Sequence, residues 1–445
     1  MPHAPTTTDD TTTTDATNTD PISGETMPVS SQSRPRQSRP HTARLGASRR
    51  TVLKGTAAAT ALGGLELSGH GLTGSMATAG AAPTAHSAPG QLAVVFLRGG
   101  MDGLSAVVPY TEAAYHDARP TIRVPENQVL DLDGQFGMHP SMGGLHGLFG
   151  QGRLAIAVGT GNPAGDRSHF VAQDLWEYGT AGGGADGRGW VGRHLGATGA
   201  QGDSLFRGLT IGNLVNASLR GGPALGVPSI NRFGLVGAAS RFSESIVNTY
   251  EGARPIEVTG QTSLAAIDQV AGVGGSNSTD PVAASFADAA SLFASGLGVE
   301  AITLDIGHWD THDEMGTWDE GEMNYLLSDL DTQLSTFQAD LDARGLNNVT
   351  TVVMSEFGRR VEENGSRGTD HGWGSHMFVM GSQVNGGVFG ASDWAGLAPG
   401  VIGRRGDVVP SIDFRDVLGD LVTGVLGGNL STALPGHSYS SVGVI

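Results

Sequence analysis

Acidic and imidazole side chains are concentrated in the segment DIGHWDTHDE, residues 305–314, which holds four acids and two histidines. The segment directly follows the apolar run VEAITL, residues 299–304, which is typical of a buried strand. Carboxylates and imidazoles are common ligands of divalent cations. Asp310 and His312 are therefore predicted metal ligands, and the alternative is a solvated polar loop.

Similar side chains flank the other apolar runs of the chain. The further candidates are Asp102, Ser168, His169, Glu356, Arg359, Asp370, His371 and His376. Because these residues adjoin separate predicted strands, one edge of a sheet can bring them together. We expect Asp102, Asp310, His312, Glu356, Asp370, His371 and His376 to bind one or two divalent ions. The pattern does not distinguish zinc, manganese, magnesium and calcium.

Each candidate also has a purely structural interpretation. Asp102 lies in a glycine-rich segment and can cap a turn, and Ser168 can cap a helix without reacting. Glu356 can form a salt bridge with Arg359 or Arg360. His376 leads into an apolar run, where a buried histidine with satisfied hydrogen bonds is nearly as plausible as a ligand. The shared position at strand ends favours a common site.

Ser168, His169 and Arg359 are the predicted catalytic residues. Ser168 opens the predicted helix SHFVAQDLWEYG, residues 168–179, and the N-terminus of a helix favours an anion. A cation on its oxygen would make the serine a nucleophile, and Arg167 or Arg359 could bind the non-bridging oxygens of the substrate. This arrangement suits transfer of a phosphoryl or sulfuryl group.

The elements that must position these residues alternate along the chain. Buried strands are predicted in 91–103, 153–163, 299–307, 347–360 and 375–384, with long helices in 280–298 and 319–345. This order predicts an α/β fold with a doubly wound, mainly parallel sheet and helices on both faces. Residues 213–298, which begin with a stretch rich in Gly, Ser and Asn, are predicted to be an insertion or lid.

The first 88 residues are predicted to lie outside this domain. Residues 1–47 are rich in Thr, Asp, Ser and Pro and are expected to be disordered. Residues 48–88 contain Arg49, Arg50 and a weakly apolar run, which is typical of a twin-arginine signal peptide and linker. We expect residues 89–445 to form the exported domain, in the periplasm, at the cell surface or outside the cell, without a membrane span.

Composition excludes several kinds of chemistry. The chain has no cysteine, and its only lysine is Lys54, so residues 89–445 lack a thiol nucleophile, a Schiff-base lysine and a P-loop lysine. Residues 89–445 hold 19 of the 26 basic and 38 of the 44 acidic side chains, a formal charge of −19. Such a surface repels nucleic acid, whereas a bound cation would still admit a small anionic substrate.

The segments FLRGGMDGLS, GDRSHF, DIGHWDTH, SEFGR and GTDHGWGS, between about residues 92 and 385, carry a family resemblance. On these segments the chain resembles an uncharacterised family of twin-arginine-exported, sulfatase-like bacterial proteins, domain of unknown function 1501, within the alkaline-phosphatase-like superfamily. The resemblance implies a bimetal site at the carboxyl edge of the sheet. It implies metal ligation by Asp102, Asp310 and His312, a nucleophilic role for Ser168, and a later histidine ligand from Asp370-His371 or His376.

The chain departs from the superfamily pattern in two places. It has SEFGR where an Asp-His pair is usual, with Glu356 in that position, and no cysteine or Ser-x-Pro-x-Arg motif for a formylglycine nucleophile. Two hypotheses follow. The first is an exported metal-dependent hydrolase of a phosphate or related ester. The second is a non-catalytic exported protein that binds or assembles with a partner protein through its Gly-rich insertion.

Overall fold

The computed structural model describes residues 90–182, 186–199, 204–234, 245 and 248–445. The predicted disordered segment (1–47) and the predicted signal segment (48–88) lie outside these residues. Among the described residues, no helix combines the length and the apolar character needed to cross a bilayer.

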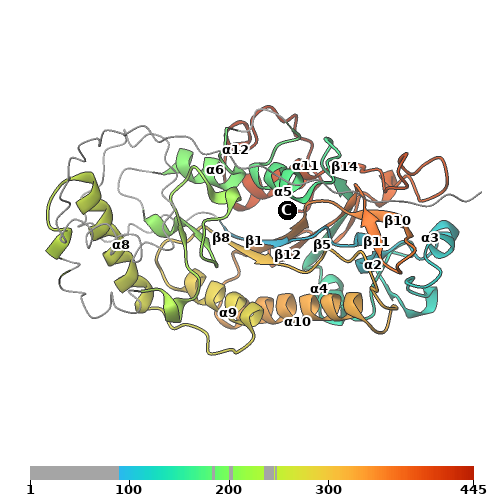
Figure 1. Ribbon diagram of the computed structural model, residues 1–445, viewed down its shortest axis with the longest axis horizontal. Helices are drawn as coiled ribbons and strands as arrows, with labels where there is room; N and C mark the ends of the chain where they lie inside the picture. Colours follow the sequence, from blue (N-terminus) through green and yellow to red (C-terminus); the bar gives the residue numbers. More distant parts are fainter. Residues whose placement is uncertain (1–89, 183–185, 200–203, 235–244, 246–247) are drawn as a thin grey trace, which may run out of the picture. The chain divides into compact units, whose positions relative to one another are not determined.

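A nine-stranded sheet forms the centre of the domain (Figure 1). Its order is β13-β5-β12-β9-β1-β8-β6-β7, and β14 pairs with β5. The strands are β1 (Gln91–Leu97), β5 (Leu154–Gly161), β6 (Gly208–Thr210), β7 (Ala224–Gly226), β8 (Ala301–Ile306), β9 (Val349–Ser355), β12 (Ser375–Gly381), β13 (Gly387–Phe389) and β14 (Ile412–Asp413). All pairs are parallel except those of β12, which is antiparallel to β5 and β9. The predicted α/β fold with a mainly parallel sheet is confirmed.

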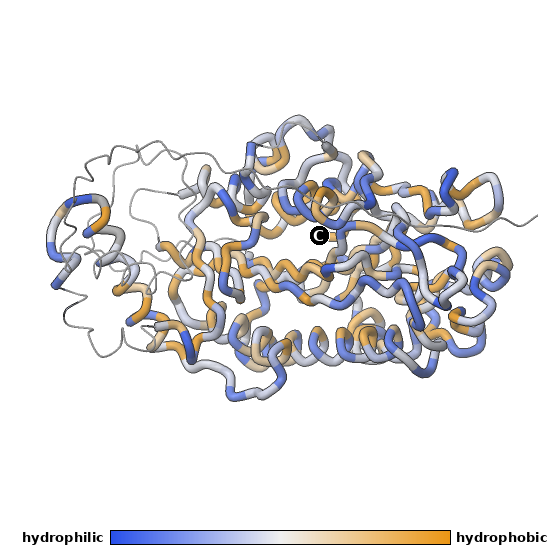
Figure 2. The backbone as a smooth tube through the Cα atoms, viewed as in Figure 1, coloured by the Kyte–Doolittle hydropathy of each residue, from blue (hydrophilic) through white to orange (hydrophobic). Residues whose placement is uncertain are grey.

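Helices cover both faces of the sheet (Figure 1). One face is covered by α4 (Gly143–Gly150), α9 (Pro281–Ala294) and α10 (Glu322–Ala343). The other face is covered by α5 (His169–Tyr178), α6 (Trp190–Thr198), α11 (Phe414–Asp420) and α12 (Leu430–Ala433). Strand β1 is buried on both faces. Val95 packs into the hydrophobic core beneath α4, α9 and α10, and Val94 packs into the core beneath α5, α6, α11 and α12. The continuous apolar sequence of β1 lies along the hydrophobic centre in Figure 2.

The segment predicted as an insertion or lid, residues 213–298, is partly integrated into this core. It contributes β7 at the edge of the sheet and α9, which packs beside α10. It also contains α8 (Pro255–Ala271). The strand β7 has only three residues, Ala-Leu-Gly, which is too short for a sequence pattern to reveal.

Smaller elements lie outside the main sheet. Strands β2 (Val107–Val108), β3 (Leu130–Asp131) and β4 (Gly137–Met138) form a three-stranded sheet. Strands β10 (Arg359–Glu363) and β11 (Thr369–His371) form an antiparallel pair. The helices α2 (Gly103–Ala106) and α3 (Ala113–Ala118) are short.

The register of the central strands brings remote segments to one edge. Leu97 of β1 pairs with Ile306 of β8 and with Ser355 of β9, so all three strands end at the same level. Strand β12 runs in the opposite direction, and its first residue, Ser375, pairs with Thr160 near the end of β5. The segment that enters β12 therefore meets the segments that leave β1, β5, β8 and β9, at the carboxyl edge where ligands bind in such sheets.

Candidate metal centre

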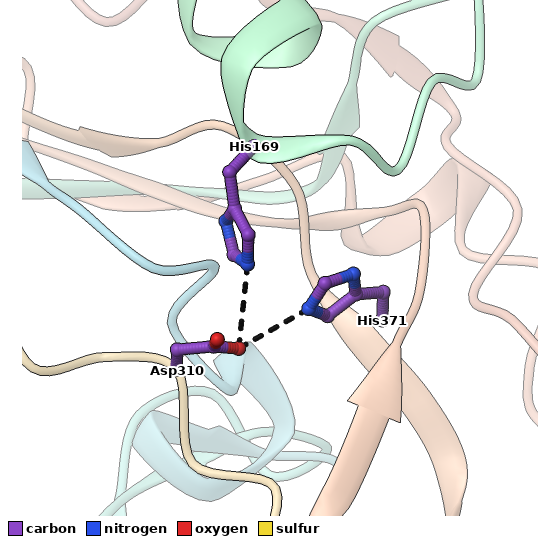
Figure 3. Close-up of side chains that lie close together, drawn as sticks. All are labelled: His169, Asp310 and His371. Carbon is purple, nitrogen blue, oxygen red and sulfur yellow. Dashed lines mark hydrogen bonds and ion pairs between the residues drawn. The ribbon is translucent and has the colours of Figure 1, made fainter. Parts of the chain in front are cut away.

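Three histidines converge on one carboxylate oxygen at this edge (Figure 3 shows two of them). The Oδ1 atom of Asp310 lies 3.4 Å from Nε2 of His169, 3.0 Å from Nε2 of His312 and 3.1 Å from Nε2 of His371. His169 begins α5, Asp310 and His312 follow β8, and His371 ends β11. Remote parts of the chain thus direct the same ring nitrogen toward one point.

The opposite nitrogen of each ring faces an acceptor. Nδ1 of His169 is 2.8 Å from Oε1 of Glu356, and Nδ1 of His371 is 2.9 Å from the carbonyl oxygen of Arg167. Nδ1 of His312 lies 3.7 Å from Oδ1 of Asp370. An acceptor beside Nδ1 holds the proton on that atom, which leaves a lone pair on Nε2. The rings of His169 and His371 therefore direct lone pairs at the centre, as metal ligands do, whereas the contact of His312 is too long to be a hydrogen bond.

The spacing of these donor atoms fits a single cation. Ligands of zinc lie about 2.0–2.2 Å from the ion, which separates neighbouring ligand atoms by roughly 3–3.5 Å. Donor atoms of His169, Asp310 and His371 all lie within 4.8 Å of one another, and Nε2 of His312 is 2.9 Å from Nε2 of His371. Nε2 of His169 is buried and has no hydrogen-bond partner. The donor set and this orphaned atom both fit a bound cation.

The protonation states also suit a cation. Burial raises the pKa of Asp310, but the hydrogen bond from Arg359 and the positive charge of its guanidinium outweigh it and hold the pKa below its usual value. Burial lowers the pKa of His371, mainly by disfavouring the imidazolium form. At neutral pH the carboxylate is therefore ionised and this imidazole is neutral, which are the forms that bind metal.

Glu356 lies behind His169 and not at the point of convergence. It is 1% exposed, and its Oε1 accepts hydrogen bonds from the backbone N–H of Gly99 at 2.9 Å, from His169 at 2.8 Å and from Nε2 of Gln173 at 2.8 Å. Burial raises its pKa, but the bonds from Gln173 and His169 lower it below its usual value. The sequence pattern predicts a metal ligand here, whereas the contacts make Glu356 an orienting carboxylate.

Arg359 forms hydrogen bonds with several neighbouring segments of the protein. It is 1% exposed and donates to the backbone carbonyls of Gly99, Gly100, Trp309 and Thr369, and to Oδ1 of Asp310 at 2.8 Å. These bonds use its N–H groups to fasten the loops after β1 and β8 to β11. Arg359 was expected to bind substrate oxygens, but this arrangement assigns it the task of positioning Asp310.

Two predicted ligands lie away from Asp310. Asp102 is fully buried, caps α2 through the N–H of Ser105 and pairs with Arg119, whose Nη1 is 2.9 Å from Oδ2. His376 is 2% exposed on β12, where its Nδ1 accepts from the N–H of Gly159 at 3.3 Å. Burial lowers the pKa of His376 to about 4. The structure thus does not bring Asp102 and His376 to the centre.

The remaining predicted residues, Asp370 and Ser168, lie at the border of the candidate metal centre. Asp370 is near Nδ1 of His312 and pairs with Arg360, whose Nη1 is 3.3 Å from Oδ2. Ser168 is exposed and is the N-cap residue of α5, but its side chain forms no hydrogen bond with the first turn. The segment around Ser168 reaches the centre through His169 and through the carbonyl of Arg167.

Comparison with known families gives a partial match. A family model described as "Protein of unknown function (DUF1501)" matches residues 268–401. No curated protein matches the chain. The matched segment includes Asp310, His312, Glu356, Arg359 and His371 and begins after His169. The chain is therefore similar to an uncharacterised domain family over the part that supplies most of the centre.

Two supporting residues were not among those predicted from the sequence. Gln173 lies four positions after His169, so both are on the same face of α5, and this spacing was a usable signal. Asn364 donates from Nδ2 to the carbonyl oxygen of His312 at 2.8 Å and to Oδ1 of Asp370 at 3.2 Å. No pattern marks Asn364, because it contacts these residues only through the β10–β11 turn.

Proposed function

We propose that this chain is a metal-dependent hydrolase of a phosphate or related ester, with Asp310, His169, His312 and His371 as the metal ligands. The observation that supports this proposal is the convergence of three Nε2 atoms on one carboxylate oxygen, while Nδ1 of His169 and of His371 is hydrogen-bonded to an acceptor. When bound, a divalent cation lowers the pKa of water and stabilises negative charge on an ester oxygen.

The donor set favours a single ion of the zinc or manganese type. Imidazole ligands suit transition metals better than magnesium or calcium, which prefer oxygen. Arg359 supports a single ion because its guanidinium already carries positive charge at Asp310 Oδ1, 2.8 Å away. A second dication beside the same oxygen would be repelled by that charge.

The residues around the centre have distinct proposed roles. His169 and His371 hold the cation, while Glu356 and the Arg167 carbonyl keep the two rings in the required tautomer. The N-terminus of α5 has backbone N–H groups without intrahelical partners, and these favour the anionic group of the substrate. Ser168 carries an exposed hydroxyl at that end and remains the proposed nucleophile.

The finer assignments also belong to this proposal. We propose an alkaline-phosphatase-like, sulfatase-like fold, export of the folded domain by the twin-arginine route, and a periplasmic or extracellular location. The paired Arg49 and Arg50 support export, and the charge of −19 for residues 89–445 supports a small anionic ester over nucleic acid as substrate. Replacement of both arginines by lysine should retain the protein in the cytoplasm, whereas unchanged export would contradict this route.

A non-catalytic exported binding or assembly protein is the second candidate. The observation that favours it is again the contact between Arg359 and Asp310, because the guanidinium can neutralise the carboxylate without a metal. Under this hypothesis the cluster would be a structural ion-pair network, and the protein would contain no stoichiometric metal.

Metal analysis combined with activity assays separates the two candidates. We expect close to one ion per chain, and hydrolysis of 4-nitrophenyl phosphate, bis(4-nitrophenyl) phosphate or 4-nitrophenyl sulfate. His371→Ala should lose both the ion and turnover, while His146→Ala, a histidine in α4, should keep both. Ser168→Ala identifies the nucleophile: lost turnover with retained metal indicates the serine, and retained turnover indicates water. A metal-free, inactive wild-type protein would refute the hydrolase.

A further inference from the structure

We infer that the ion pair of Arg167 and Asp407 positions the proposed metal ligand His371. This inference rests on the proposed function, since it assigns a positioning role at the proposed metal centre. Nδ1 of His371 donates to the backbone carbonyl oxygen of Arg167 at 2.9 Å. The side chain of the same arginine pairs with Asp407, 240 positions further along the chain. The residue that supplies the acceptor for a ligand histidine is thus attached to a remote segment.

The carboxylate of Asp407 is held in place by the backbone on both of its sides. Asp407 is 1% exposed. The N–H of Val361, in β10, donates to the carbonyl oxygen of Gly406 at 2.9 Å. The N–H of Gly374, between β11 and β12, donates to the carbonyl oxygen of Val408 at 3.0 Å. The carboxylate is therefore fixed relative to the β10–β11 pair, whose last residue is the ligand histidine.

Arg167 lies in the loop between β5 and α5, two positions before His169. Residues 162–168, all of which the structure describes, form no helix or strand, so side-chain hydrogen bonds help to fix their backbone. Nη1 of Arg167 donates to the carbonyl oxygen of Gly165 at 3.1 Å, and Nη2 pairs with Asp407. One guanidinium thus connects its own loop to the remote carboxylate.

Stability alone does not account for this pair. Oδ1 of Asp407 and Nε of Arg167 are buried and have no hydrogen-bond partner among the described residues. A buried ion pair with unsatisfied atoms contributes little net free energy of folding, because desolvation of both charges offsets their attraction. An acceptor that orients a ligand histidine, by contrast, typically contributes roughly 10–100-fold to metal affinity. We therefore assign the pair a role at the metal centre.

The zinc affinity of three variants tests this role, measured on the full chain by competition with a chromogenic chelator. Asp407→Asn, Arg167→Met and the double variant should each bind zinc about tenfold more weakly than wild type. The backbone carbonyl is present in all three, so the loss must arise from its displacement.

The two single variants also separate positioning from a charge effect. By electrostatics alone, removal of the carboxylate would weaken binding of a cation, whereas removal of the guanidinium would strengthen it. Weaker binding in both Asp407→Asn and Arg167→Met therefore indicates positioning. The double variant leaves neither charge of the pair buried without its partner, so it keeps the test valid where a single variant fails to fold.

Glu300→Gln is the matched control. Glu300 is a buried carboxylate paired with Arg207, and it directly precedes β8, at the opposite end of this strand from the centre. This variant disturbs an equally buried ion pair and should bind zinc as wild type does. Circular dichroism checks that every variant is folded.

The outcomes distinguish this inference from the proposed function. Failure of wild type to bind zinc refutes the metal-dependent hydrolase, and the positioning role with it. Wild-type zinc affinity in the folded variants, tighter binding by Arg167→Met, or an equal loss in Glu300→Gln overturns the positioning role alone. A loss in the double variant equal to the product of the two single losses also overturns it, because the two side chains would then act independently.

Discussion

At the scale of single residues, the centre depends on which nitrogen of each histidine carries a proton. Glu356 fixes this for His169, because its Oε1 lies 2.8 Å from Nδ1 and the side chain is fully enclosed. Gln173 and the N–H of Gly99 hold the same oxygen in place. A ring that lost this carboxylate would be free to rotate or to change tautomer, and its lone pair would no longer point at Asp310.

Glu356→Gln is therefore expected to weaken zinc binding by roughly 10–100-fold, the usual effect of removing a carboxylate that orients a ligand histidine. Competition with a chromogenic chelator measures the affinity. Glu362→Gln is the control, since Glu362 is exposed on β10. Circular dichroism should show that both variants are folded. Unchanged zinc affinity in folded Glu356→Gln would mean that Glu356 does not orient His169.

At the scale of elements, the loops after β1 and β8 approach each other closely. Gly99 has a φ of +126°, and a Cβ atom at this position would lie 2.5 Å from the backbone nitrogen of Asp310. The N–H of Trp309 donates to the carbonyl oxygen of Arg98 at 3.2 Å, which locks the two loops together. Only glycine permits both this backbone conformation and this approach.

Gly99→Ala should accordingly destabilise the fold and displace Asp310. Gly134→Ala separates the cost of the positive φ from the cost of the close approach. Gly134 also has a positive φ of +84°, but a Cβ atom added there would meet nothing within 4 Å. We expect Gly134→Ala to cost about 1 kcal/mol in the free energy of unfolding, and Gly99→Ala clearly more. Urea denaturation measures both, and equal losses would show that the close approach costs nothing.

The buried pair of Asp102 and Arg119 joins α2 and α3 to β10. Arg119 donates from Nε to the carbonyl oxygen of Val361 at 2.8 Å and from Nη2 to that of Arg360 at 2.9 Å, while Asp102 holds its Nη1. The pair thus supports the strand that begins with Arg359. Its role is structural, although the sequence pattern made Asp102 a predicted ligand.

Asp102→Ala should leave the Arg119 charge buried without its partner and cost about 3–5 kcal/mol of unfolding free energy. The same variant should bind zinc with wild-type stoichiometry under conditions where it is folded. Chemical denaturation and metal analysis on one preparation test both statements. Folded Asp102→Ala that has lost its zinc would restore Asp102 as a ligand.

At the scale of the whole domain, burial of two histidines outside the centre couples stability to pH. His139 is 1% exposed and His376 is 2% exposed, and burial lowers the pKa of each to about 4. Below the unfolded pKa of about 6.5 the unfolded chain binds protons that the folded domain does not accept. The free energy of unfolding must therefore decrease as the pH falls from about 6.5 toward 4.

Each of these histidines should account for up to about 3 kcal/mol of that decrease, from the difference of roughly 2.5 pKa units. Urea denaturation between pH 7 and pH 4.5, in the presence of a chelator, measures the loss. His376→Phe should reduce the slope, since one proton-binding group is removed from the unfolded state. A slope that His376→Phe leaves unchanged would contradict the assignment.

The periodicity of the sequence determined much of the domain. Apolar runs in 91–103 and 347–360 predicted buried strands, and apolar spacing of three and four residues predicted helices in 280–298 and 319–345. The structure has β1, β9, α9 and α10 in these segments. These features are local, since an element buried on one or both faces leaves a pattern in its own residues. The predicted gathering of donors after the strands likewise follows from the parallel sheet, and Asp310, His312 and His371 do meet there.

Only the tertiary structure decided which donors share one point and which serve other partners. Asp102 and Asp310 both follow strands. Asp102 is paired with Arg119, 17 positions further along the chain, whereas three imidazoles surround Asp310. Likewise Glu356 and His371 adjoin neighbouring strands, but Glu356 contacts the ring of His169, whereas His371 directs its own ring at Asp310. Sequence specifies the type of each side chain and the edge it occupies. The direction of a side chain depends on partners brought close by folding, and local patterns do not record them.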